Sequence, residues 1–177
     1  MIPWFIATQR FTSEDEAWGK YIHFSGLTQL REVVTLDGVL CTILLPETKA
    51  EYWPYVVTDD FLVAFFTDFD FLMKQVAHME NTNVLCVFRN PSEKPIAPKV
   101  AQFEFLGYDL VDIPCGVSAL TNCGGFPDAF ANNELTQHGL LPELDRANEV
   151  RSSLRLLHPE EHHAQCDVWA LFRMIQA

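Results

Sequence analysis

The sequence predicts an α+β fold in which two or three helices pack on a mostly antiparallel or mixed sheet of about five to seven strands. The chain has 177 residues, which is the length of a single domain. Of these residues 49% are apolar and 20% are charged, a composition typical of a globular protein. Helical and strand-like segments alternate without the regular rhythm that predicts a parallel sheet. We therefore expect residues 1–177 to form a single globular domain.

The first 44 residues are expected to contain a strand, a short helix and a hairpin. The apolar segment 2–8 predicts the strand, with a proline near its start, where the edge of a sheet tolerates it. Ser13 and Glu16 have the S-x-x-E spacing of a capping box, which predicts a short helix ending near residue 21. β-Branched residues flank an Asp-Gly pair in 32–44, which predicts two strands joined by a tight turn.

The middle of the chain predicts a strand, an amphipathic helix and another strand. An apolar run over 61–66 is typical of a buried strand, and apolar residues then recur at helical spacing over 68–79. The apolar segment 83–89 predicts the next strand. Four carboxylates lie before or inside the helix: Asp59, Asp60, Asp68 and Asp70. Paired carboxylates can bind Mg²⁺, but a carboxylate at a helix start accepts hydrogen bonds from free N–H groups, so we interpret Asp68 as a helix cap.

The second half predicts two further strands and the clearest helix. The segment 91–98 holds three prolines and is expected to be an exposed loop. A junction between subdomains would fall here if the chain had two, but neither half is large enough to require that division. Strands are predicted over 103–112 and 166–174. A helix over 142–157 begins with a proline at a suitable first position, and its acidic start and basic end complement the helix dipole.

The chain is acidic, with a formal net charge of −12 from 24 acidic and 12 basic residues. Lysines and arginines are not clustered, so nucleic-acid binding is not expected. The start of the chain lacks the basic region of a signal peptide, and the longest apolar run is too short to span a membrane. We therefore expect a cytoplasmic protein with no membrane association. The five cysteines include no C-x-x-C pair and are expected to be reduced.

Residues able to bind a metal are most concentrated near the end of the chain, in HPEEHHAQCDVWALFR. Three of them have a spacing that would let them approach one zinc ion: His158, His163 and Cys166. A fourth ligand would come from one of two more distant cysteines, Cys115 or Cys123. In the alternative interpretation, the first histidine ends a helix, the acidic histidine turn is solvated and the cysteine is a small buried residue. We favour the alternative, because a histidine and a cysteine three positions apart have little specificity, and we expect no other cofactor.

A second cluster places Cys123 directly before two glycines. Cys123 would be a nucleophile on a tight turn, whose backbone N–H groups would stabilise an oxyanion, and His162 or His163 would be its base. In the alternative interpretation, the glycines form a turn that requires positive φ angles and the thiol packs in the interior. We favour this alternative because buried thiols are usually inert.

The stretch 121–139 is rich in Asn, Gly, Asp and Pro and is expected to be a functional loop or to contain a short helix. Asparagines before Glu134 would suit the start of such a helix. We predict that this stretch forms a binding surface. The polar and aromatic residues expected to make contacts are Asn122, Phe126, Asp128, Asn132 and Asn133.

The sequence has no nucleotide-binding glycine loop, zincin motif or serine-hydrolase motif, which argues against an enzyme. In size and charge it resembles small acidic bacterial α+β proteins of the immunity or inhibitor type. We expect a cytosolic protein-interaction module that binds a basic partner, and the aromatic residues beside an acid at 51–53 agree with this. The alternatives are a small hydrolase or transferase that uses Cys123, and a structural zinc site near the C-terminus.

Overall fold

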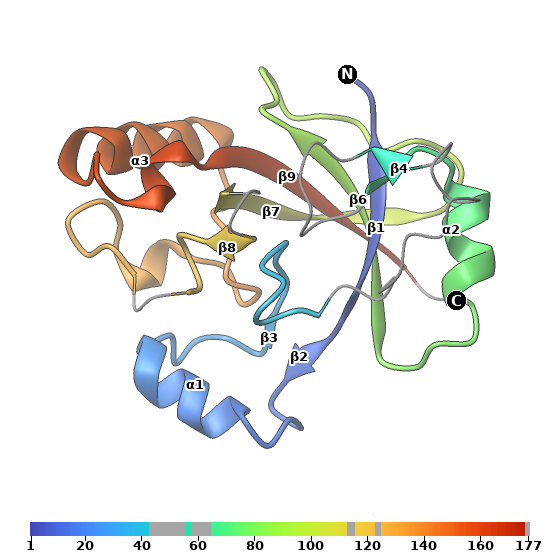
Figure 1. Cartoon of the computed structure of the whole chain (residues 1–177), viewed down its shortest axis with the longest axis horizontal. Helices are drawn as coiled ribbons and strands as arrows, with labels where there is room; N and C mark the ends of the chain where they lie inside the picture. Colours follow the sequence, from blue (N-terminus) through green and yellow to red (C-terminus); the bar gives the residue numbers. More distant parts are fainter. Residues whose placement is uncertain (43–55, 58–64, 113–115, 123–124, 176–177) are drawn as a thin grey trace.

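The computed structural model describes residues 1–42, 56–57, 65–112, 116–122 and 125–175. Within these residues, seven strands form one sheet in the order β4-β5-β1-β6-β9-β7-β8, and every pairing is antiparallel (Figure 1). The predicted α+β class with a mostly antiparallel sheet is thus confirmed. The strands are β1 (Trp4–Gln9), β4 (Val56–Val57), β5 (Phe65–Phe66), β6 (Thr82–Arg89), β7 (Phe103–Asp112), β8 (Val117–Ser118) and β9 (Asp167–Met174).

A smaller sheet and the helices complete the described fold. The small sheet pairs β2 (Phe11–Thr12) with β3 (Glu32–Val33). The helices are α1 (Trp18–Ser25), α2 (Phe69–Val76) and α3 (Leu144–Leu157), with short 3-10 turns η2 (Asn132–Glu134) and η3 (His162–Gln165). In Figure 1, α2 and α3 lie at opposite ends of the main sheet, and α1 lies beside the small sheet. No helix in the described part of the chain is long and apolar enough to cross a membrane.

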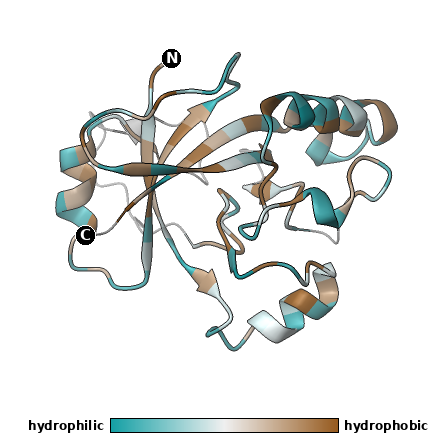
Figure 2. Cartoon of the chain, turned by 180° about the vertical axis from the view of Figure 1, so that it is seen from behind, coloured by the Kyte–Doolittle hydropathy of each residue, from teal (hydrophilic) through white to brown (hydrophobic). Residues whose placement is uncertain are grey.

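The central strands are buried on both faces. On one face, Phe5 and Cys86 belong to the same apolar cluster as Leu72 of α2 and Leu154 of α3. On the other face, Trp169 belongs to a second cluster, which includes residues that follow the small sheet. Burial on both faces explains why these strands are almost continuously apolar rather than alternating. Figure 2 shows bands of both colours along α3, as expected for a helix with one face on the sheet.

Several predicted elements are confirmed. The strands expected over 2–8, 83–89, 103–112 and 166–174 correspond to β1, β6, β7 and β9, and the helix predicted to end at 157 is α3. The predicted cap of α2 is also correct, since the backbone N–H of Phe71 donates to Asp68 Oδ1 at 2.9 Å. Of the strand predicted over 61–66, the described part is β5, and 61–64 lie outside the described residues. Asp59, Asp60 and the aromatic segment 51–53 also lie outside them.

The predicted hairpin over 32–44 is wrong in its described part, 32–42. β3 pairs with β2, which precedes it in the chain, and not with residues that follow the Asp-Gly pair. Asp37 is fully buried, and its Oδ1 accepts from the N–H groups of Val39 and Leu40 at 2.8 and 3.2 Å. The Asp-Gly pair therefore begins a buried turn held by the aspartate side chain, instead of an exposed hairpin turn.

The predicted capping box is also wrong. Ser13 and Glu16 do not cap α1, because that helix begins after Ala17 and has no side-chain cap. Thr12 and Asp15 form the local turn instead, with the N–H of Thr12 donating to Asp15 Oδ2 at 2.7 Å. Aromatic packing of α1 against β2 favours this later helix start.

The proline-rich loop 91–98 connects β6 to β7, two strands of the same sheet with β9 between them. The loop is only partly exposed. Pro91 and Pro95 are buried, whereas Ile96 is almost fully exposed.

A bulge in β7 lets a distant loop approach the sheet. The register shifts between Phe105 and Gly107, and Gly107 has a φ of +144°. Next to the bulge, the N–H of Tyr108 donates to the carbonyl of Leu141 at 2.7 Å, and the N–H of Leu141 donates back at 2.9 Å. A Cβ atom on residue 107 would lie 2.7 Å from the Cβ of Leu140, so this close approach requires glycine.

Candidate functional site

The turn between α3 and β9 lies against the loop 125–131. His158 ends α3, and its Nε2 lies 2.8 and 3.0 Å from the two carboxylate oxygens of Asp128. The ring of Phe126 contacts two histidines, with centroid distances of 4.9 Å to His158 and 5.1 Å to His163. The fold therefore brings together two segments that the sequence identified separately, one from the predicted binding loop and one from the predicted metal cluster.

His163 is the buried member of this turn, with only 2% of its surface exposed. Its ring lies against the exposed ring of His162, and the two centroids are 3.9 Å apart. Among the described residues, neither ring nitrogen of His163 has a hydrogen-bond partner. Burial lowers the pKa of His163, and a positive charge on His162 would lower it further. The neutral imidazole, which is the metal-binding form, is therefore favoured at pH 7.

The three residues predicted to bind zinc do not converge, so that ligand set is corrected. The ring of His158 is hydrogen-bonded to Asp128. Cys166 lies in the core, where burial raises the pKa of its thiol to about 12. In the described part of the chain, a different set has potential ligand atoms that all lie within 4.8 Å of one another: Glu161, His162 and His163. Glu161 belongs to the acidic histidine turn that the sequence interpretation treats as solvated, although a carboxylate directly before two histidines is a recognisable ligand pattern.

The predicted nucleophile lies outside the described residues, as does Cys115. The pairing of Cys123 with His162 or His163 therefore stays a prediction. Three described cysteines are free and buried: Cys41, Cys86 and Cys166. Burial raises the pKa of each of these thiols, which makes them poor nucleophiles.

The predicted binding loop is attached to the body of the protein at several points. Asn122 donates its amide to Asp37 Oδ2 at 2.8 Å. Asn132 and Asn133 lie inside η2 rather than before a longer helix, and the carbonyl of Asn132 accepts from the Gln29 amide at 2.5 Å. These contacts hold the described part of the loop against the rest of the protein.

A buried carboxylate, Asp109 of β7, contacts β8 and the segment that follows β3. Asp109 is inaccessible to solvent and accepts hydrogen bonds from the hydroxyls of Thr35 and Ser118, at 2.5 and 2.7 Å. It also accepts from the backbone N–H groups of Leu36 and Leu110. Burial nevertheless raises the pKa of Asp109 to about 6. Because Asp109 contacts the segment after β3 as well as β8, its evident role is to join them to β7.

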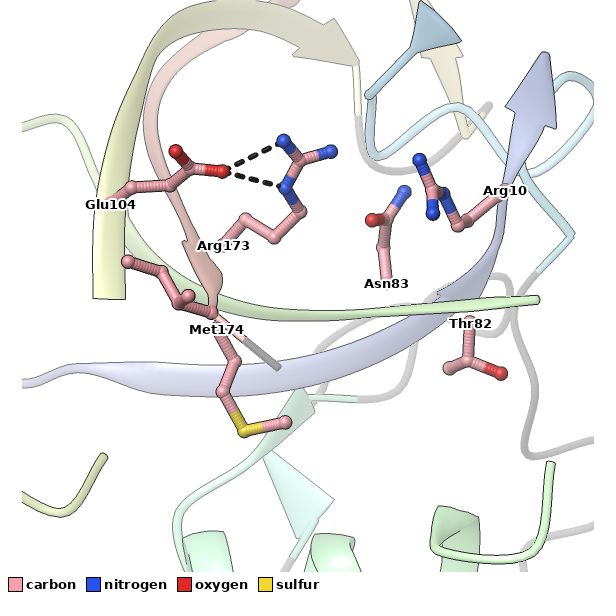
Figure 3. Close-up of a pocket in the computed structure, with 7 residues that line it drawn as sticks. Arg10, Thr82, Asn83, Glu104, Arg173 and Met174 are labelled. Atoms are coloured by element: carbon pink, nitrogen blue, oxygen red, sulfur yellow. Dashed lines mark hydrogen bonds and ion pairs between the residues drawn. The ribbon is translucent and has the colours of Figure 1, made fainter. Parts of the chain in front are cut away.

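A polar pocket of about 210 Å³ lies where the ends of β6, β7 and β9 meet (Figure 3). Figure 3 shows the Arg173 guanidinium directed at Glu104, with its Nε and Nη2 2.9 and 2.7 Å from Oε1. The guanidinium of Arg10 and the amide of Asn83 lie next to each other, and both donate to Glu32 Oε1. Two arginines in a pocket suggest an anion site, but both are already paired with carboxylates.

Glu32 is the buried centre of this network, with its side chain only 6% exposed. Its two oxygens accept from Arg10 at 2.8 and 3.2 Å, from Asn83 at 3.1 Å and from Arg173 at 2.7 Å. Burial alone would raise the pKa of Glu32, but the hydrogen bonds from Arg10 and Asn83 and the charge of Arg173 lower it overall. Because Glu32 lies in β3 and its partners lie on or beside the main sheet, the network joins the two sheets.

The arginines and the acidic residues of α3 differ in their contacts. Each arginine of this helix binds the body of the protein: Arg146 binds Glu134 and the carbonyl of Ala129, Arg151 binds Asn90, and Arg155 binds the carbonyl of Ala164. The acidic residues at the start and middle of the helix are exposed: Glu143, Asp145 and Glu149. Asp145 and Glu149 line a shallow, open depression together with Arg146, Ser152 and Ser153.

The end of α3 is exposed and apolar. Leu156 is 79% exposed, and Leu157 next to it is about half exposed. The helix thus presents an acidic start and an apolar end on its outer side.

No family model, curated protein or solved structure matches the chain.

Proposed function

We propose that this protein is an interaction module that binds a basic partner protein through the outer face of α3. The observation that carries the proposal is the separation of charge on this helix. Its arginines donate hydrogen bonds to other parts of the protein, and Arg146 also pairs with Glu149, whereas within the described residues neither Glu143 nor Asp145 forms an ion pair. An acidic surface of this kind attracts basic partners and accelerates their association.

The acidic surface extends beyond the helix itself. Exposed carboxylates are found on α3, on the loop beside its end and on the turn that follows it: Asp128, Glu143, Asp145, Glu149, Glu160 and Glu161. On the helix, Asp145, Glu149 and Leu156 have i, i+4 and i+11 spacing, which places them along one side. A partner with basic residues around an apolar contact would complement this side.

The other candidate sites give less support to catalysis. The described thiols are buried, and the arginines of the polar pocket are paired with glutamates. We retain the inhibitor or immunity type as the finer form of the proposal, since the acidic surface suits the masking of a basic enzyme. The use of Cys123 as a nucleophile remains the alternative.

The test uses the full chain as bait in a lysate of its own organism at low salt, followed by binding measurements with the purified partner. A D145K/E149K variant reverses two charges on α3, and an E14K/E16K variant makes the same change on exposed residues before α1. We expect a basic partner whose dissociation constant rises at least tenfold with D145K/E149K and stays nearly unchanged with E14K/E16K.

Two further measurements, the salt dependence of association and the inhibition of an enzyme partner, also test the proposal. Raising the salt concentration should slow association of the wild-type chain more than that of D145K/E149K, because salt screens the charges that guide the encounter. If the partner is an enzyme, a stoichiometric complex should inhibit it. Equal weakening by both variants, or the absence of any partner that depends on α3, would refute the proposal.

A further inference from the structure

We propose that Glu161, His162 and His163 bind a divalent transition-metal ion of the zinc type on the turn between α3 and β9. Two imidazoles and one carboxylate are a ligand set that zinc uses in proteins, with the remaining position open to water or to a partner's side chain. Glu161 also belongs to the acidic surface, but metal binding at this turn is tested without a partner protein.

The first observation is the geometry of the turn. The potential ligand atoms of the three residues lie within 4.8 Å of one another. Bonds of about 2.0–2.2 Å in a tetrahedral site place ligand atoms roughly 3.3–3.6 Å apart, so a modest contraction is needed. Glu161 and His162 are exposed and can rotate to supply it, whereas the buried ring of His163 is held against Phe126.

The second observation concerns His163 alone. Only 2% of its surface is exposed, and within the described chain neither of its ring nitrogens has a hydrogen-bond partner. Leaving a buried polar group unpaired is unfavourable, so buried imidazoles normally have partners. A metal ion at this position would give one of the two ring nitrogens a partner.

The local charge also suits a cation. Glu160 and Glu161 precede the two histidines, and the buried carboxylates of Asp112 and Asp37 are close enough to act on His163. His158 is not required, because its ring is already bound to Asp128.

The test titrates Zn²⁺ into the full chain purified without a histidine tag, and measures binding by calorimetry and the rise in melting temperature. The H162A and E161Q variants remove exposed ligands and should fold normally. The controls are E160Q, which alters the neighbouring exposed glutamate, and H78A, which removes an exposed histidine elsewhere. We expect one Zn²⁺ per chain, with the dissociation constant raised at least tenfold by H162A and by E161Q and unchanged by both controls.

Cobalt provides an independent readout, because a Co²⁺ ion held by nitrogen and oxygen ligands in a tetrahedral site absorbs visible light. The wild-type chain should develop this absorption and H162A should not. The proposal is overturned if the wild-type chain does not bind Zn²⁺, or if E160Q and H78A weaken binding as much as the ligand variants do.

Discussion

Replacing Glu32 by glutamine removes the negative charge at the centre of the network that joins the two sheets. Glutamine preserves the size of the side chain but exchanges one acceptor oxygen for an NH₂ group. Arg10, Asn83 and Arg173 donate four hydrogen bonds to this carboxylate, and at least two of them would then meet a donor. We therefore expect E32Q to lower the free energy of unfolding.

The expected loss is about 2–3 kcal/mol. Breaking a fully buried ion pair costs about 3–5 kcal/mol, because the remaining charge is left uncompensated. Here the cost is smaller, since the Arg10 side chain is 41% exposed and Arg173 retains its bonds to Glu104. In a domain of this size, that loss lowers the melting temperature by roughly 4–12 °C.

Urea unfolding at pH 7 measures the loss, with E104Q as the matched control. Glu104 is 43% exposed and pairs only with Arg173 in the described network, so its replacement should cost less than about 1 kcal/mol.

The pKa of folded Glu32 is lowered, so its stabilisation is complete above the ordinary pKa of 4.5 and is lost as the pH falls through the folded value. A loss below about 1 kcal/mol, or a difference between wild type and E32Q that persists at low pH, would refute the assigned role.

Three further substitutions test other features. G107A should destabilise the protein by about 2–4 kcal/mol in urea unfolding, because the new Cβ would overlap Leu140 at a positive φ; a loss below about 1 kcal/mol would contradict the required close approach. The pKa of Asp109 is raised to about 6, so its contribution to stability is present below about pH 4 and declines as the pH rises to 6. The advantage of wild type over D109N should therefore shrink by up to roughly 3 kcal/mol between pH 4 and 7, and a constant difference would contradict the shift. D68A should cost about 1 kcal/mol through loss of the cap to Phe71, and D70A should cost less.

The elements that could be predicted from the sequence are those with a strong local signal. The apolar spacing of α3, the aspartate cap of α2 and the long apolar runs of β6 and β9 depend on residues within the element itself. The hairpin prediction failed because β3 pairs with β2, a strand more distant in sequence than the Asp-Gly turn. Burial of Asp37 also depends on distant donors, the N–H of Ser118 and the amide of Asn122.

The candidate site was only partly predictable for a similar reason. The sequence identified the closing histidines, but their contact with Phe126 depends on how the loop folds back against α3. The acidic face of α3 was also hidden, since the mixture of acids and arginines along this helix does not reveal which charges are paired. The partners are set by the fold, in which Arg146 binds Glu134 and Arg151 binds Asn90.

The position of β9 has a consequence for how the chain is synthesised. Among the described strands β9 comes last in the sequence, yet it lies between β6 and β7 in the sheet. On the ribosome, β6 and β7 must therefore wait with unpaired edges until residues 167–174 have emerged. Such edges are sites of aggregation that chaperones protect in nascent chains. A premature stop before residue 167 would thus produce two separated half-sheets prone to aggregation, rather than a slightly shorter protein.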